Sequence, residues 1–107
     1  MEYTIFQVKR ENPDFRMFMN SSWHASHGVK ISVSAYDCIY KGKLPDGQNA
    51  NAVLETLWER FNISHPADFK GHSLSVSDVV VLTSNGTSDA YFCDSVGWTP
   101  VPGFFET

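Results

Sequence analysis

The chain is poor in cysteine, in basic residues and in long hydrophobic runs, and each shortage excludes a class of protein. Two cysteines among 107 residues are too few for the disulfide framework of a small secreted domain. Eight Lys and Arg face twelve Asp and Glu, which gives a net charge of -4, and only Lys9 and Arg10 are adjacent. Because binding to a phosphate backbone requires clustered cations, direct contact with nucleic acid is not expected. No apolar run approaches the roughly 20 residues that a membrane span needs, so no membrane partner is expected.

Bulky hydrophobic side chains, by contrast, are abundant. Hydrophobic residues make up 42% of the chain and aromatic residues 14%, which is typical of a globular domain rather than a disordered segment. The length fits one domain over residues 1–107, either a whole protein or a piece of a longer one. The N-terminal residues lack the basic and apolar regions of a secretory signal, so a cytoplasmic protein is expected. In that compartment Cys38 and Cys93 are expected as thiols, a bridge between them being the alternative.

Four segments have the composition of β-strands, rich in β-branched and aromatic residues. They are residues 3–9, 36–40, 79–82 and 90–94. Alternation within the second segment predicts that Tyr36, Cys38 and Tyr40 share one face of the sheet. The third segment is apolar throughout, as expected of a strand that is covered on both faces. Asn85 and Gly86 follow it, and because both tolerate positive φ they predict a tight hairpin.

Two helices are also predicted. The clearer one spans residues 50–62, where apolar side chains recur at three- and four-residue spacing. Its apolar stripe consists of Val53, Leu54, Leu57, Trp58 and Phe61. A shorter helix spans residues 23–27, between a run of capping Asn and Ser side chains and Gly28, which can take the left-handed conformation that ends a helix. We expect Trp23 to anchor this helix to the core.

The element order β-α-β-α-β-β predicts an α+β fold. We expect a small mixed or mainly antiparallel sheet of about four strands, with two helices packed on one face. Residues 16–19 are expected to be an extended connection. The segment after Trp98 contains two prolines and a glycine, so it cannot be regular throughout. We expect Trp98 and Phe104 to cap the open end of the core. Phe104 and Phe105 cannot both point inward from an extended segment, so we expect Phe105 to be exposed.

A long and specific run lies in the second half of the chain, Asp68-Phe69-x-Gly71-x-Ser73-Leu74-Ser75-Val76-x-Asp78-Val79-Val80. This run resembles the YodL-like family of small bacterial domains, and the resemblance extends over nearly the whole chain. Residues 57–62 and 90–98 continue the match on either side, and residues 36–44 fit the family's tyrosine-rich strand with its following glycine. Cys93 and Trp98 depart from the family pattern, and both changes are of the kind that repacking accommodates.

The resemblance implies a context rather than a mechanism. Domains of this family occur alone and within long multidomain proteins of plasmids and conjugative elements, beside antirestriction, helicase and other DNA-processing modules. The family supplies no established activity and no catalytic residue that could be carried over. It therefore favours a non-catalytic accessory domain of mobile genetic elements that binds a protein partner. An antirestriction or nucleic-acid-processing accessory role is an alternative that the same context leaves open.

Reactive residue types are present, but their spacing forms no recognised catalytic or metal-binding motif. The four histidines and two cysteines offer metal ligands, yet only His24 and His27 are spaced to converge, so no metal ion or other cofactor is expected. His72 and Ser73 are not accompanied by the Gly-x-Ser-x-Gly turn of a serine nucleophile. On these grounds no catalytic residue is predicted.

The loop from His65 to Asp78 is the main candidate for a functional surface. A small enzyme or ligand-binding domain that uses this loop is the alternative to a protein-interaction module. Residues 73–78 alternate in polarity and could form an edge strand that a partner's strand extends. We predict an interaction or ligand surface that combines this loop with the exposed C-terminal aromatic side chain. It consists of Asp68, Phe69, His72, Ser73, Ser75, Asp78 and Phe105.

Overall fold

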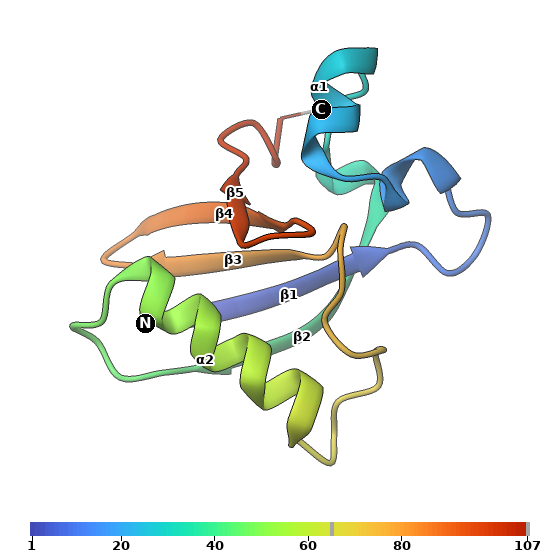
Figure 1. The fold of residues 1–107 in the computed structure, drawn as a ribbon. Coiled ribbons are helices and arrows are strands. Elements are labelled where there is room, and N and C mark those ends of the chain that lie inside the picture. The colour runs from blue at the N-terminus through green and yellow to red at the C-terminus, as the bar shows by residue number, and fades with distance from the viewer. Residues whose placement is uncertain (65, 107) are drawn as a thin grey trace.

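The computed structural model describes residues 1–64 and 66–106, which contain a five-stranded sheet with every neighbouring pair antiparallel (Figure 1). The strands are β1 (Glu2–Val8), β2 (Tyr36–Lys43), β3 (Val79–Ser84), β4 (Thr87–Cys93) and β5 (Trp98–Pro100), in the spatial order β2-β1-β3-β4-β5. The helices are α1 (Ser21–His27) and α2 (Ala50–Ile63), with short 3₁₀ helices η1 (Phe15–Phe18) and η2 (Val33–Ala35). The predicted α+β class is confirmed, with five strands rather than about four. The additional strand is β5, which lies at the sheet edge, where a proline is tolerated because no further strand needs its amide.

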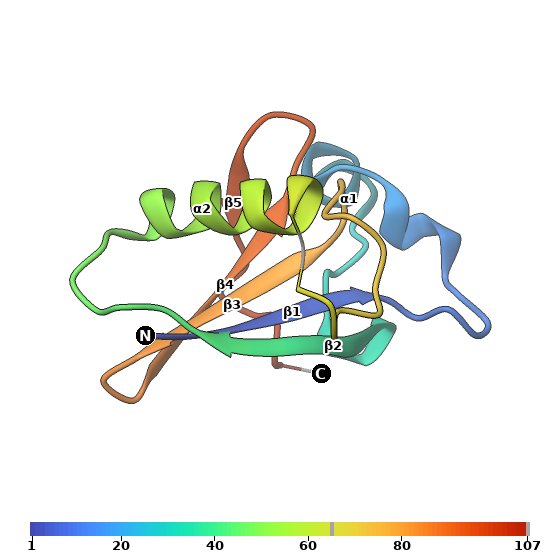
Figure 2. The same ribbon diagram turned by 90° about the horizontal axis from the view of Figure 1, so that it is seen from below.

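Helix α2 covers one face of the sheet (Figure 2). The Asn49 side chain caps this helix by accepting a hydrogen bond from the Ala52 amide at 2.9 Å. The buried side of α2 packs against the alternate inward residues of β1 and β3. This cluster includes Tyr3, Ile5, Val53, Leu54, Leu57, Phe61, Val80 and Leu82. Trp58 was expected in the same stripe, but it is 39% exposed because it lies about 100° around the helix from Leu57.

The opposite face of the sheet is covered by irregular chain. Alternate residues of β1, β3 and β4 pack there against side chains from residues 29–35 and from the C-terminal segment, which Figure 2 shows on the side away from α2. Phe104 is fully buried in this second cluster and Phe105 is 54% exposed, so both predictions for the aromatic tail are confirmed. Helix α1 reaches the sheet through His24, whose ring centre lies 5.9 Å from that of Phe92 on this face, so the prediction that both helices pack on one face was wrong.

A β-bulge changes the phase of β2. Ile5 pairs with Tyr40 while Phe6 pairs with Cys38, so Ile39 is an extra residue in the ladder. As a result Tyr40 packs on the α2 side of the sheet and Tyr36 packs in the cluster on the opposite side. The prediction that Tyr36, Cys38 and Tyr40 share one face was therefore wrong. Strict alternation holds only where the ladder has no inserted residue.

The segment before α1 also differs from expectation. Residues 16–19 were expected to be extended, but η1 covers most of them because the Asp14 carboxylate accepts a hydrogen bond from the Arg16 amide at 3.1 Å and starts a helical turn. Trp23 was expected to anchor α1, but His24 is the buried residue, at 3% exposure. Trp23 is half-buried and stacks on His27 instead, with ring centres 4.3 Å apart.

Two turns follow the sequence closely. Asn85 and Gly86 have φ values of 53° and 80°, which is the left-handed pair that a two-residue hairpin between β3 and β4 requires. Gly28 has a φ of 64° and its amide bonds the His24 carbonyl, so it ends α1 as predicted.

Candidate functional site

The fold disperses the residues predicted as a functional surface. Asp68 accepts a hydrogen bond from the Tyr40 hydroxyl at 3.1 Å, and Phe69 is buried in the core beside Phe61. Phe105 packs its ring against Phe6, on the face that α2 does not cover. The remaining four residues lie between positions 72 and 78 and fold against the end of β1. His65, the first residue of the predicted loop, lies outside the described residues.

Residues 73–78 do not form a strand. The Asp78 amide bonds the Ser75 carbonyl at 3.1 Å, which closes a turn, and the Cys93 amide bonds the Asp78 carbonyl at 2.8 Å. The prediction of an edge strand here was wrong, because these backbone groups are used within the turn and toward β4. The outermost strands of the sheet are β2 and β5.

Asp78 is the centre of a buried polar cluster. Its carboxylate is fully buried and accepts hydrogen bonds from the Gln7 side-chain amide at 3.1 Å and from the Ser75 backbone amide at 3.0 Å. Its Oδ1 atom lies 3.9 Å from Nε2 of His72, which is half-exposed. Burial raises the pKa of Asp78 to about 7, although the hydrogen bonds and the nearby His72 oppose that shift. A carboxyl group with such a pKa suits acid–base chemistry.

The same cluster attaches the loop to the sheet. The Gln7 amide also donates to the His72 carbonyl at 2.8 Å, so one side chain ties the loop both to Asp78 and to β1. The Tyr36 hydroxyl adds a bond to the Ser77 carbonyl at 2.6 Å. Gly71 passes so close that a Cβ atom there would collide with Gln7 Oε1. The arrangement fastens the loop to the sheet, and the Asp78 side chain at its centre is fully buried.

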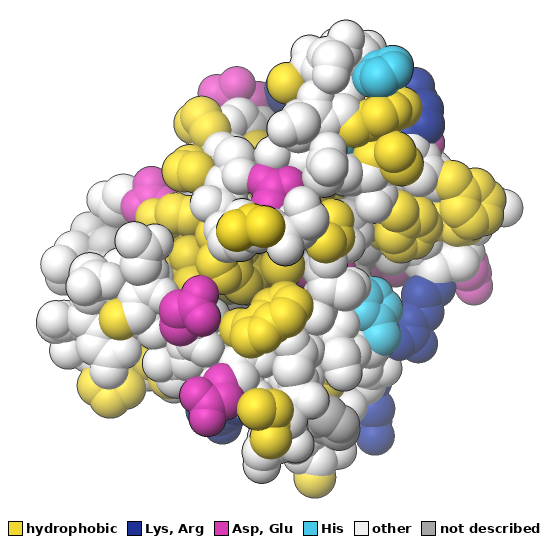
Figure 3. All heavy atoms as spheres, in the orientation of Figure 1, with side chains coloured by type: hydrophobic (Ala, Val, Ile, Leu, Met, Phe, Trp, Pro, Cys, Tyr) yellow, Lys and Arg dark blue, Asp and Glu magenta, His cyan; other side chains and the backbone are white. Residues whose placement is uncertain are grey.

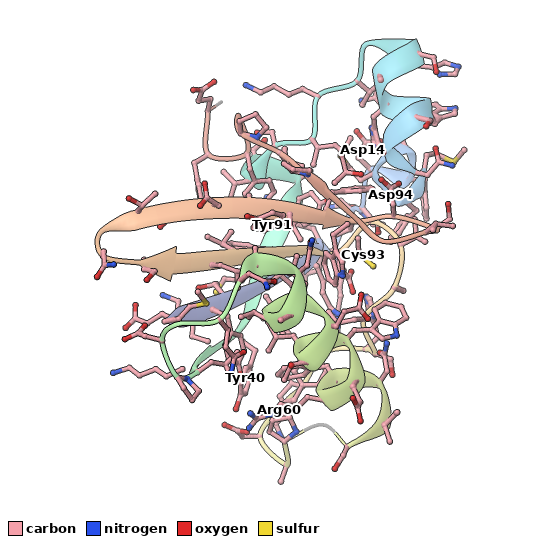
Figure 4. The ribbon with its side chains drawn as sticks, turned by 60° about the vertical axis from the view of Figure 1, so that its left-hand side comes forward. Asp14, Tyr40, Arg60, Tyr91, Cys93 and Asp94 are labelled. Atoms are coloured by element: carbon pink, nitrogen blue, oxygen red, sulfur yellow. The ribbon has the colours of Figure 1, made fainter. Side chains whose placement is uncertain are left out.

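A hollow lies on the α2 side of the molecule, between α2 and the β4–β5 turn. It has a volume of about 180 Å³ and is lined by Glu55, Trp58, Cys93, Asp94, Ser95, Gly97 and Trp98. Figure 3 shows hydrophobic side chains gathered in this region, with acidic side chains around them. In Figure 4, Cys93 and Asp94 lie at the end of β4, with Asp94 toward α1 and Cys93 toward α2.

The hollow is electrostatically negative. Burial would raise the pKa of Asp94, but hydrogen bonds from Ser21 and Thr99 outweigh it, so the pKa lies below its ordinary value and the group is ionised at neutral pH. Glu55 is exposed and has no ion pair within the described residues. Burial, followed by the charges of Asp78, Asp94 and Glu55, raises the pKa of Cys93 to about 12, so its thiol stays protonated and is not a nucleophile.

Sequence reasoning missed this hollow. It placed Trp58 in the core and Trp98 over the end of the core, whereas both side chains keep an exposed part that faces the hollow. One signal was available: Glu55 and Trp58 are three residues apart on a helix, so they are neighbours on its surface. The approach of Asp94 and Trp98 depends on the short β4–β5 turn, which the sequence did not predict.

Comparison with known proteins identifies one family. A family model described as YodL-like domain matches residues 2–104, nearly the whole chain. No curated protein and no solved structure matches. Within the described residues, no three His, Cys, Asp or Glu side chains gather in the way metal ligands do, and no helix has the length and hydrophobicity to cross a membrane.

Proposed function

The chain belongs to the YodL-like domain family, and from that premise we propose that it is a non-catalytic protein-interaction module that holds a basic side chain of its partner between α2 and β5. The observation that carries the proposal is the composition of the α2–β5 hollow. Two tryptophans and two carboxylates line it, and no Lys or Arg is among its described lining residues. Such a site is complementary to a cation, because indole faces and carboxylates both attract positive charge.

The size of the hollow favours a single side chain. Its volume of about 180 Å³ is below the roughly 300–1,000 Å³ that is usual for small-molecule sites. The Glu55 carboxylate is exposed and has no ion pair in the part of the chain that the structure describes, so a guanidinium or ammonium group can reach it without displacing another cation. Asp94 also lines the hollow, and hydrogen bonds from Ser21 and Thr99 hold its carboxylate in place.

The surroundings of the hollow favour a protein as the source of that side chain. Three large apolar side chains of one short segment are exposed to solvent: Phe15 by 75%, Phe18 by 44% and Met19 by 42%. Figure 3 shows hydrophobic side chains over η1 and α1 on the same face as the hollow. Exposed apolar surface of this kind marks protein-binding sites. We infer a partner that presents a basic residue flanked by apolar ones.

The cellular setting is part of the proposal. Membership of the family supports a cytoplasmic accessory role in proteins of mobile genetic elements. The net charge of -4 argues against direct nucleic-acid contact. The alternative, a small enzyme or ligand-binding domain that uses the loop from His65 to Asp78, is less favoured because the side chain of Asp78 is fully buried.

Titration with short peptides tests the proposal. Capped Phe-Arg-Phe is added to the ¹⁵N-labelled chain, and Phe-citrulline-Phe, which has nearly the same shape without the charge, is the control. We expect amide shifts to concentrate at residues 55–58 and 93–98 with the arginine peptide alone. Equal shifts with both peptides, or shifts confined to other residues, would reject the basic side chain as the ligand.

A further inference from the structure

A second depression, the α1 groove, lies between α1 and the C-terminal segment. It is shallow and open to solvent, and it has a volume of about 380 Å³. It is lined by Ser21, His24, Ala25, Gly28, Val29, Lys30, Ile31, Thr99, Pro100, Val101, Pro102 and Gly103. Two of these residues, Ser21 and Thr99, donate hydrogen bonds to Asp94. None of the residues that line the α1 groove also lines the α2–β5 hollow.

His24 is the unusual member of this lining. The residue is only 3% exposed, and neither of its ring nitrogens has a hydrogen-bond partner within the described residues. Its ring contacts are aromatic, with centres 5.9 Å from Phe92 and 5.3 Å from Trp23. A buried imidazole normally has at least one partner for its polar atoms, because leaving them unpaired is unfavourable. The groove is therefore lined by a buried imidazole whose ring nitrogens lack hydrogen-bond partners within the described residues.

The charges around the groove indicate which head group fits. Lys30 lies at the rim and has no ion pair within the described residues. No Asp or Glu is among the described lining residues, and the charge of Asp94, which lies behind Ser21 and Thr99, is taken up by hydrogen bonds from those two residues. Apolar side chains, chiefly Val29, Ile31 and Val101, make up most of the remaining wall. A ligand that is complementary both to Lys30 and to the apolar wall has one negative head group and an apolar body.

We propose that the α1 groove binds a small carboxylate with an apolar body, whose head group bonds His24 and pairs with Lys30. The ring nitrogens of His24 are covered, so the head group reaches them when α1 and residues 99–103 separate slightly. Binding then gives the imidazole the partner that it lacks in the free protein. The proposal does not depend on the α2–β5 hollow, which has the opposite charge preference.

The test uses 4-phenylbutyrate with the full chain, and 4-phenylbutanol and 4-phenylbutylamine as matched neutral and cationic probes. We expect the carboxylate to shift the ring signals of His24 and the amides of residues 99–103 in NMR spectra, and to bind several-fold more tightly than either control. Equal affinity for all three probes, or the absence of shifts at His24 at millimolar ligand, would overturn the proposal.

Three variants separate the role of His24 from a general change in the fold. His24→Leu should weaken binding of 4-phenylbutyrate by about tenfold or more, while His27→Ala, on the exposed side of the same helix, should leave it unchanged. Lys30→Gln should weaken binding by about threefold. If His24→Leu does not fold, Lys30→Gln and the ring signals of His24 in the unaltered chain decide the matter. Unchanged affinity in Lys30→Gln, together with unshifted ring signals, would contradict the assignment.

Discussion

The side-chain amide of Gln7 donates a hydrogen bond to the carboxylate of Asp78 at 3.1 Å, and both residues are almost completely buried. Gln7 lies in β1 and Asp78 directly precedes β3, so the bond joins the two central strands at one end. Through its second bond, to the His72 carbonyl, Gln7 also holds the preceding loop. The most specific stretch of the family resemblance, residues 68–80, is thereby explained as a structural fastening.

The first prediction concerns Asp78 and pH. The pKa of this group in the folded chain is raised to about 7 from an ordinary value of 3.8, so the folded state holds the proton more tightly than the unfolded state does. Its contribution to stability is complete below about pH 4 and is lost as pH rises through about 7. Asp78→Asn should remove this loss and stabilise the chain at pH 8 by an amount on the order of 1–3 kcal/mol.

Urea unfolding of the unaltered chain and Asp78→Asn at pH 4.5, 6 and 8 measures that effect. The difference in unfolding free energy between the two proteins should grow in favour of the variant with pH. Taking the difference removes the contributions of other groups, since these are common to both proteins. A difference that is constant across the range would show that Asp78 is ionised throughout.

The second prediction concerns Gln7. Gln7→Met keeps the length of the side chain but removes both hydrogen bonds, so it should lower the unfolding free energy by about 1–3 kcal/mol. The amides of residues 72–77 should also exchange faster with solvent, because the loop loses its attachment to β1. Gln48→Met, at an exposed position in the loop before α2, is the matched control and should change neither quantity. Equal effects of the two substitutions would contradict the role assigned to Gln7.

The third prediction concerns Asp94, which fastens α1 to β5. Its carboxylate accepts bonds from the Ser21 amide and hydroxyl and from the Thr99 hydroxyl. Asp94→Asn should lower the unfolding free energy by about 1–3 kcal/mol at neutral pH. Because the folded pKa of Asp94 lies below its ordinary value, this stabilisation is present above the unfolded pKa and is lost as pH falls through the folded one.

Chemical unfolding at pH 7 and pH 2.5 checks the Asp94 prediction. The gap between the unaltered chain and Asp94→Asn should narrow at the lower pH. Asp89→Asn, at an exposed position in β4 whose side chain has no hydrogen bond or ion pair within the described residues, serves as the control and should have little effect. If the difference in unfolding free energy between the unaltered chain and Asp94→Asn were larger at pH 2.5 than at pH 7, the prediction that hydrogen bonds stabilise the ionised form of Asp94 would be wrong.

The main secondary structure was predictable because its causes are local. The spacing of Leu54, Leu57 and Phe61 defines α2, and Asn85-Gly86 defines the β3–β4 hairpin. The bulge at Ile39 was not predictable, because it depends on which residues of β1 face β2 across the ladder. The burial of His24 in place of Trp23 also depends on tertiary contact, since both residues suit a short helix.

The candidate sites were less predictable than the fold. Glu55 and Trp58 are neighbours on one helix, but Asp94 and Trp98 reach them only through a turn that follows β4. Asp78 was predicted as a site residue because it lies at the end of a loop. In the structure its carboxylate accepts hydrogen bonds from Gln7 and Ser75, which hold that loop against β1. Burial of a polar residue is set by the packing of distant segments, and a sequence does not specify it locally.

The fourth prediction concerns Trp58. Because it is 39% exposed at the margin of the core, Trp58→Leu should change the unfolding free energy by less than about 1 kcal/mol. It should nevertheless weaken binding of the Phe-Arg-Phe peptide by about fivefold, through the loss of the indole face. Trp23→Leu, which alters a half-buried tryptophan outside the hollow, is the control for binding. Equal losses of affinity in both variants would point to a non-specific apolar contact.

The most direct measurement of the central claim is the dissociation constant of the Phe-Arg-Phe peptide for the unaltered chain, for Glu55→Gln and for Glu59→Gln. Glu55 lines the α2–β5 hollow, and Glu59 is an exposed residue of α2 that does not. The account predicts that Glu55→Gln weakens binding by about threefold or more, and that Glu59→Gln leaves it unchanged. Identical dissociation constants for Glu55→Gln and the unaltered chain would contradict it.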